Sequence, residues 1–492
     1  MNESCVGPLE PVTASFRDPA GQLFALDRRI FRIVKSKGSK CLASAINSPA
    51  VQSFIDRGSF VRTEILSPAS SAQVAKQLGD WNFEHAEERT EVVEHEAIEF
   101  PSYAYEWPPE MLWAAGVLTL ELARELTPEG LGLKDATPYN ILYRGPTPVF
   151  IDVLSIEPRD HLDPIWLPRA EFIRTFILPL LANKRLGIPL DQLMTRREGV
   201  EPELMYRWLT PIQKLLPGYL TLVSMPVWLA SKAAADPRIY RKRAVSSAEK
   251  SRFILDHAFS TLHRQLNAVA PARNRESAWS NYMQSKDCKQ AAVSYTHEEF
   301  ARKEQIVTKA IAGFAPVRVL DIGCNTGHFS RIAARKNAAV VALDADPAVV
   351  GQTWRSAREE KLNILPLVVN IAKPSPALGW RNAEYRSFLS RATGAFDLVL
   401  MLAVVHHMLA TERIPLREIL KLASELTTDG LIMEFVPPDD PMFRSLSRGR
   451  DELYAHLNPD LFERTSKPFF EIVQRHAMNS GRWLYVMRKR LD

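Results

Sequence analysis

Cysteine is scarce in this 492-residue chain, and its positions exclude two kinds of site. The four cysteines, Cys5, Cys41, Cys288 and Cys324, are scattered, and no two have the spacing of zinc ligands or of a redox-active pair. The N-terminus also lacks the basic segment and apolar core that a secretion signal requires. Both absences fit a reducing compartment, and we expect the protein in the cytoplasm.

Strong net charge and long apolar runs are missing as well. The net charge of +5 is small for this length, so we do not expect a nucleic-acid partner. We interpret the basic run at 238–243 as a solvated helix face or a linker rather than an RNA or membrane patch. The most apolar stretch, 215–230, is shorter than the roughly 20 residues of a transmembrane segment. It predicts buried or helix-packing surface, with peripheral membrane contact as the alternative.

The length suits two or three domains. Residues 18–268 have an α+β pattern, with a small β-rich lobe to about residue 107 and a helical lobe after it. Residues 269–290 contain Pro-Ala-Arg-Asn-Arg-Glu-Ser and are the expected linker. Residues 291–492 form the second predicted domain.

That second domain alternates strands with helices, which predicts an α/β fold with a parallel sheet covered on both faces. An antiparallel hairpin ends the pattern. The expectation is therefore a Rossmann-like sheet of seven strands, at 317–322, 339–344, 365–370, 395–402, 431–436, 469–473 and 483–487.

The first of these strands leads into a glycine turn and a helix. Gly323 and Gly327 let the backbone approach a ligand, and the start of the helix offers free N–H groups. The second strand ends on Asp344, at about the 20-residue spacing from which an acid binds ribose hydroxyls. These features predict a cradle for an adenosyl cofactor.

The stretch Asp321-Ile-Gly-Cys-Asn-Thr-Gly327, with Asp344 and Phe396-Asp397, resembles the class I S-adenosylmethionine-dependent methyltransferases over roughly residues 290–490. The whole chain is also similar to the rhizobial host-specific nodulation methyltransferase family, including Glu-Phe-Val-Pro-Pro-Asp-Asp at 434–440. Asn325 replaces the usual middle glycine. Because asparagine tolerates a left-handed backbone, we expect the turn to survive.

The resemblance implies roles for individual residues. Asp344 would bind the ribose and Asn370 the adenine amine, and the other cofactor-binding residues would be Asp321, Gly323, Asn325, Gly327, Leu402 and Ala403. A hydroxyl or acid acceptor also needs a base, for which the candidates are His406, His407 and Glu434. Alternatively, one histidine packs and the other caps a helix. Trp279 and Tyr295 are candidate covers for the cofactor, with packing in the core as the alternative.

The first domain has an acidic group of its own. Asp135 and Asn140 are five residues apart, and Asp152 ends the next strand. The stretch resembles the catalytic loop of the protein kinase-like and aminoglycoside phosphotransferase-like folds. This implies Asp135 as base, Asn140 and Asp152 as Mg²⁺ ligands, Mg-ATP as a cofactor, and a nucleotide-anchoring Lys35 or Lys37. The alternative is that Asp135 and Asn140 only make Asx-turn hydrogen bonds.

Three functional hypotheses follow. The first is a methyltransferase that uses S-adenosylmethionine to methylate oxygen or nitrogen of a small-molecule or saccharide acceptor. The second is a bifunctional or phosphotransferase-like enzyme that uses Asp135, Asn140 and Asp152. The third is a non-catalytic partner protein that binds the cofactor.

Overall fold

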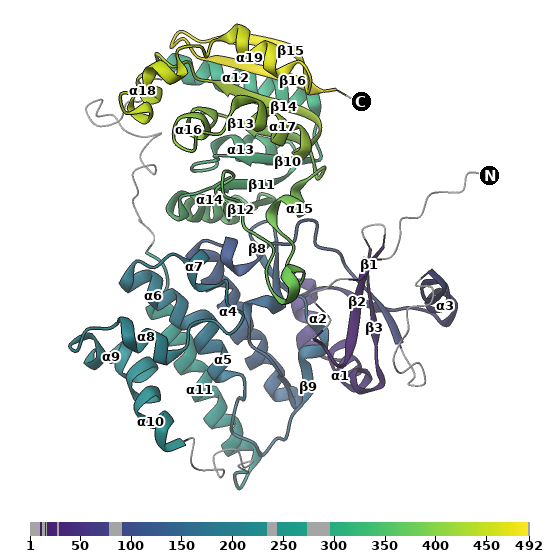
Figure 1. Cartoon of the computed structure of the whole chain (residues 1–492). Helices are drawn as coiled ribbons and strands as arrows, with labels where there is room; N and C mark the ends of the chain where they lie inside the picture. The colour runs from purple at the N-terminus through teal and green to yellow at the C-terminus, as the bar shows by residue number, and fades with distance from the viewer. Residues whose placement is uncertain are drawn as a thin grey trace. The chain divides into compact units, whose positions relative to one another are not determined.

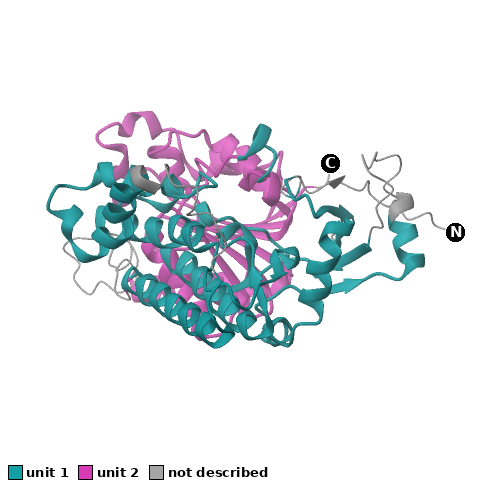
Figure 2. Ribbon diagram, turned by 90° about the horizontal axis from the view of Figure 1, so that it is seen from below, with its two compact units in different colours: residues 1–271, 377–385 teal, residues 272–376, 386–492 magenta. Residues whose placement is uncertain are grey.

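The computed structural model describes residues 10–11, 15, 17–26, 29–77, 91–233, 244–272 and 296–490. The chain divides into two compact units, Met1–Pro271 with Ala377–Tyr385, and Ala272–Pro376 with Arg386–Asp492 (Figure 2). The first unit therefore includes a segment from the second half of the sequence. The basic run at 238–243, most of the expected linker, Trp279 and Tyr295 lie outside the described residues.

The first unit begins with a five-stranded antiparallel sheet in the order β1-β2-β3-β5-β4 (Figure 1). Its strands are β1 (Glu10–Pro11), β2 (Gly21–Leu26), β3 (Arg29–Val34), β4 (Thr63–Ile65) and β5 (Glu91–His95). Strand β4 begins only at Thr63, because Phe60 and Val61 pair with Phe150 instead. Helices α1 (Ser36–Ile46), α2 (Pro49–Asp56) and α3 (Pro68–Gln77) accompany the sheet.

Helix α4 (Pro109–Leu126) lies at the core of the rest of this unit, and most of its residues are buried. Two short antiparallel pairs follow it, β6 (Leu131–Leu133) with β9 (Ile156–Pro158) and β7 (Ile141–Arg144) with β8 (Thr147–Phe150). The remainder is helical, as predicted: α5 (Arg169–Phe172), α6 (Leu178–Leu186), α7 (Leu190–Leu193), α8 (Pro202–Trp208), α9 (Pro217–Tyr219), α10 (Met225–Ala233) and α11 (Ala248–Ala268). Among the described helices, none is long and apolar enough to cross a membrane.

The second unit contains the predicted seven-stranded sheet, in the order β12-β11-β10-β13-β14-β16-β15. The first five strands in this order are parallel, and the last two form the antiparallel hairpin that closes it. The strands are β10 (Arg318–Ile322), β11 (Ala339–Asp344), β12 (Ile364–Val368), β13 (Phe396–Met401), β14 (Thr427–Phe435), β15 (Phe470–Ala477) and β16 (Trp483–Lys489). This topology confirms the predicted Rossmann-like fold.

Helices cover both faces of this sheet. Apolar side chains of α12 (His297–Phe314), α13 (His328–Ala334) and α14 (Pro347–Glu359) share one buried cluster with the strands. On the opposite face Phe462 stacks on Tyr485, whose side chain alternates with those of the cluster. The remaining helices are α15 (Phe388–Ala392), α16 (Val405–Ala410), α17 (Leu416–Leu426), α18 (Pro441–Ser447) and α19 (Pro459–Ser466).

Candidate functional site

A cavity of about 320 Å³ lies in the second unit at the carboxyl ends of β10, β11, β12 and β13. This is the edge at which open α/β sheets bind ligands. Most residues predicted to bind the cofactor line it, together with one of the predicted bases: Asp321, Gly323, Asn325, Asp344, Asn370, Leu402, Ala403 and His407. Gly327, His406 and Glu434 do not line the cavity.

The turn after β10 has the left-handed backbone expected of it. Gly323, Asn325 and Gly327 have φ angles of 76°, 50° and 73°, so asparagine does adopt the conformation of the missing glycine. At Gly327 a Cβ atom would meet the Thr353 side chain at 2.6 Å. Gly327 therefore allows close packing against α14, while Gly323 and Asn325 form the wall of the cavity.

Two buried acids hold the turn and face the cavity. The Asp344 carboxylate accepts hydrogen bonds from the backbone N–H groups of Asn325 and Asp346, at 2.9 and 3.0 Å. Burial raises the pKa of Asp344, and these donors oppose that shift. Asp321 accepts a hydrogen bond from the Ser330 hydroxyl, and burial raises the pKa of Asp321 to about 6. Since all these donors are neutral, both carboxylates can accept further hydrogen bonds from a ligand.

The two adjacent histidines differ in position. His407 lines the cavity, whereas the buried His406 ring has no hydrogen-bond partner among the described residues. Burial lowers the pKa of both rings. The neighbouring His407 lowers the pKa of His406 further, and the charge of Arg482 lowers the pKa of His407 further. Both are therefore neutral near pH 7. Of the pair, only His407 combines access to the cavity with a ring that can accept a proton.

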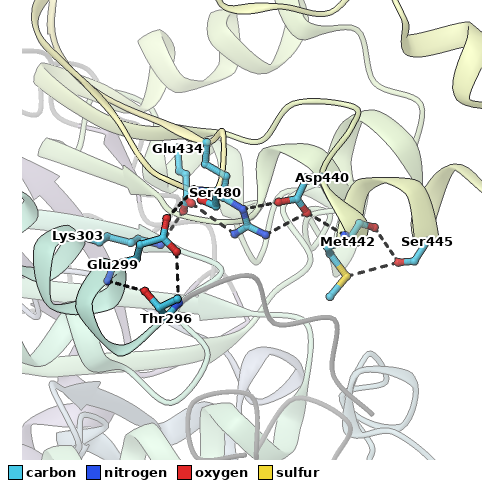
Figure 3. A network of polar contacts seen from close by, with 9 residues as sticks. Thr296, Glu299, Lys303, Glu434, Asp440, Met442, Ser445 and Ser480 are labelled. Carbon is cyan, nitrogen blue, oxygen red and sulfur yellow. Dashed lines mark hydrogen bonds and ion pairs between the residues drawn. The ribbon is translucent and has the colours of Figure 1, made fainter. Parts of the chain in front are cut away.

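Glu434 belongs to a buried network of charges (Figure 3). Its carboxylate lies 2.6 Å from the Lys303 ammonium and 3.5 Å from the Arg482 guanidinium, which also binds Asp440 at 2.8 Å. The backbone N–H of Ala403, a residue with a φ of 54°, donates to the same carboxylate. Lys303 and Ala403 both line the cavity, so Glu434 holds two parts of its wall.

Lys303 is a charged residue of the cavity that sequence reasoning missed, as is Glu412. The position of Lys303 on α12 carries no motif, and its partner Glu434 is 131 residues away in the chain. Burial and the charge of Arg482 lower the pKa of Lys303 to about 7, while burial raises that of Glu434 to about 7. Burial therefore shifts the pKa values of the two partners toward each other.

The acidic group of the first unit has a cationic partner. Asp152 forms an ion pair with Arg32 of β3 at 3.0 Å, and Arg32 also binds Asp18 at 2.8 Å. Arg32 is thus the cation beside Asp152, and the nucleotide-anchoring role of Lys35 or Lys37 stays a prediction. The side-chain nitrogen of Asn140 is buried and has no partner among the described residues. Burial and the charge of Asp152 raise the pKa of Asp135.

The segment Ala377–Tyr385 packs beside this group, which the sequence did not predict. Leu378 and Tyr385 exchange backbone hydrogen bonds of 3.0 and 3.1 Å and close the segment into a loop. Tyr385 stacks on Tyr139 at 4.8 Å, and Glu384 forms an ion pair with Arg17. Within the described residues, no group of three or more His, Cys, Asp or Glu side chains is arranged to hold a metal ion.

Comparisons with known proteins agree with the fold of the second unit. Residues 295–477 match the family model of a methyltransferase domain. Nodulation protein NoeA of Rhizobium meliloti (strain 1021) is 28% identical over 486 residues, which are 97% of this chain and 96% of that protein. The O-antigen chain terminator bifunctional methyltransferase/kinase WbdD of Escherichia coli is 27% identical over 139 residues, or 28% of this chain and 18% of that protein.

Among solved structures, the N-methyltransferase NodS from Bradyrhizobium japonicum WM9 is 13% identical and has a TM-score of 0.30. The match covers 40% of this chain and 98% of that one. The sequence matches and the order of the sheet, rather than this likeness, therefore indicate a methyltransferase domain. The second half of this chain is an S-adenosylmethionine-dependent methyltransferase domain.

Proposed function

We propose that the cavity of the second unit binds S-adenosylmethionine and that the enzyme methylates oxygen or nitrogen of a small-molecule or saccharide acceptor. One observation carries the proposal. Seven of the eight residues that the motif predicts for the cofactor line one cavity at the carboxyl ends of four neighbouring parallel strands. The proposed domain limits are 18–268 and 291–492, and the buried, unpaired Cys41 and Cys324 support a cytoplasmic location.

The described residues fit the methyl donor. Asp344 would accept hydrogen bonds from the ribose hydroxyls, and Asn370 would bind the adenine amine. Gly323, Asn325, Leu402 and Ala403 would form the wall. Lys303 would pair with the carboxylate of the methionine part, and Asp321 would face its ammonium group. The bound sulfonium supplies an activated methyl group, so the protein mainly has to align the acceptor with it.

We assign the general base to His407. It lines the cavity, and burial lowers its pKa, so the ring is neutral and able to take a proton from an acceptor hydroxyl or ammonium. Glu434 acts as a positioning residue, because it binds Lys303 and Ala403 without lining the cavity. His406 supports the ring of His407, whose centroid is 4.3 Å away.

Calorimetry with S-adenosylhomocysteine tests the cofactor site, and labelled S-adenosylmethionine added to cell extracts tests transfer. The expected results are saturable binding at one site and a labelled acceptor identified by mass spectrometry. A folded protein that binds no S-adenosylhomocysteine would contradict the proposal. Binding without transfer to any acceptor in a broad panel would favour the non-catalytic partner protein.

A second proposal concerns Mg-ATP in the first unit. The buried Arg32 beside Asp152, the unpartnered nitrogen of Asn140 and the nearby Asp135 support it. A similar protein, described as a bifunctional methyltransferase/kinase, is a precedent for both activities in one chain, although the match covers only 18% of that protein. The assay is ATP turnover with Mg²⁺. Turnover that persists in Asp152→Ala would contradict this site.

A further inference from the structure

A second cavity, of about 220 Å³, lies in the first unit and is not lined by Asp135 or Asp152. Three basic side chains line it, Arg159, His161 and Arg252, together with one acidic residue, Glu249. Over the described residues, none of the three basic side chains forms an ion pair with an acid. Guanidinium groups that lack a protein carboxylate are well suited to bind an anionic ligand.

The first wall of this cavity continues the antiparallel pair of β6 and β9. The Arg159 N–H donates a hydrogen bond to the Gly130 carbonyl at 2.9 Å. Gly130 has a φ of 71°, and a Cβ atom there would meet the His161 ring at 2.6 Å. The Arg159 side chain passes 3.7 Å from the position that a Cβ atom of Gly132 would take. The absence of a side chain at Gly130 therefore lets the His161 ring lie against the backbone, next to Arg159 on the cavity wall.

The second wall is the start of helix α11. The Ser251 hydroxyl donates to the Asp163 carbonyl at 2.8 Å, and this bond ties the helix to the segment that follows β9. Arg252 is the next residue of the helix, and Ala248 and Glu249 of its first turn also line the cavity. The first turn of a helix has unpaired N–H groups and a partial positive charge, so this wall adds to the positive potential of the first. Glu249 opposes it, but its side chain is exposed to solvent.

The charge of Arg159 is only partly compensated by the protein. Its guanidinium donates to the backbone carbonyl of Asp163, which is a neutral acceptor. Burial lowers the pKa of Arg159, and the charges of Asp163 and Asp160 oppose that shift without forming an ion pair. The carboxylates of these two acids instead accept backbone N–H groups, each from two residues further along. The half-buried guanidinium has five N–H donors, and those that the carbonyl does not use can bind a ligand.

We propose that this cavity binds a phosphate monoester. Such a group carries a charge of about −1.5 to −2 at pH 7 and has three acceptor oxygens, which match two guanidinium groups and an imidazole. A carboxylate has one charge and two oxygens, and would leave part of the basic lining without a partner. One water molecule needs about 10–15 Å³ of such a cavity, so 220 Å³ also has room for an organic group. The proposal depends neither on methyl transfer nor on Mg-ATP binding.

The test is calorimetric titration of the full chain with inorganic phosphate in the absence of Mg²⁺. We expect saturable binding. Arg159→Gln with Arg252→Gln should weaken it at least about tenfold, because charge-assisted hydrogen bonds are lost. The matched control is Arg185→Gln with Arg207→Gln. It makes the same change of charge at two exposed arginines of the same unit that do not line the cavity, and should bind phosphate unchanged.

Two further measurements keep the test informative if the double arginine variant misfolds. Glu249→Gln should have the opposite effect and tighten phosphate binding about two- to fivefold, because it removes the acid of the lining. In the wild type, phosphate should slow hydrogen exchange in peptides that cover 159–163 and 245–252. The absence of saturable phosphate binding would overturn the proposal, as would binding that survives in the Arg159→Gln, Arg252→Gln variant. Acetate that binds as tightly as phosphate would overturn the assignment to a phosphate monoester.

Discussion

The acids of the two units meet different donors. In the second unit Asp344 and Asp321 are held by backbone N–H groups and a hydroxyl. In the first unit Asp152 faces the guanidinium of Arg32. Neutral donors orient a carboxylate and leave its charge available to a ligand, whereas a cation compensates it. Acidic residues in a sequence therefore do not by themselves define a ligand site, because the hydrogen-bond donors and cations around each carboxylate determine whether it can bind a ligand.

The units also differ in what lies beside the acids. A cavity of about 320 Å³ borders Asp321 and Asp344. Beside the acidic group of the first unit, Tyr139 is stacked by Tyr385 of the loop Ala377–Tyr385. The positive charge of Arg197 acts to lower the pKa of both Asp135 and Glu384, so it affects the loop and the acidic group alike. The surroundings of the acids are thus the second point at which the two groups differ.

The largest effect is expected at His407. His407→Asn should lower the rate of methyl transfer about 10²–10⁴-fold, because the base is lost while the cofactor site is kept. The pKa of His407 lies below its ordinary value of 6.5, so wild-type activity should be flat above pH 6.5 and fall as pH drops through the lowered pKa. The measurement is labelled transfer against pH. Exposed His456→Asn is the control, and an unchanged rate in His407→Asn would exclude it as base.

The next effect concerns stability and compares two arginines. Arg482→Met leaves the buried Asp440 without its cation and Glu434 with Lys303 alone, and should cost about 3–5 kcal/mol. Arg32→Met should cost less, about 1–3 kcal/mol, because Asp18 and Asp152 are a quarter exposed. Arg488→Met, which breaks an exposed pair with Asp429, is the control at under about 1 kcal/mol.

Hydrogen exchange read separately on peptides of each unit gives these costs. The Arg482 change should loosen the second unit and the Arg32 change the first. If Arg32→Met cost as much as Arg482→Met, the first-unit acids would be as dependent on their cation as the fully buried ones, and the contrast between the two groups would fail.

The third prediction addresses ligand capacity. Asp344→Asn should weaken S-adenosylhomocysteine binding about 10–100-fold, since charge-assisted hydrogen bonds contribute about 1.5–3 kcal/mol each. Calorimetry at constant pH measures it, with Asp429→Asn as the exposed control. An unchanged affinity would mean that the Asp344 carboxylate serves only the turn, where it accepts from Asn325 and Asp346.

The sequence predicted the second unit well because its signals are local. Strands such as Ala339–Asp344 are apolar runs bounded by turns, and the capping box of Thr296 and Glu299 marks the start of α12. The pairs Lys303–Glu434 and Arg32–Asp152 join residues 131 and 120 positions apart, and no local pattern encodes them. Part of the stretch 215–230 is exposed, which was also missed, because hydropathy alone does not say which side of a helix finds a partner.

The smallest effect is expected at Tyr385. It tests whether the loop Ala377–Tyr385 limits access to the acidic group of the first unit. Tyr385→Ala removes an aromatic contact worth about 0.5–1.5 kcal/mol beyond burial, so the first unit should lose little stability. If the loop limits access, Mg-ATP should bind Tyr385→Ala more tightly than wild type, as measured by calorimetry. Asp152→Ala in the Tyr385→Ala background should remove that gain. Equal Mg-ATP affinity in wild type and Tyr385→Ala would mean that the loop does not limit access. The ion pair with Arg32 would then be the main difference between the two groups of acids.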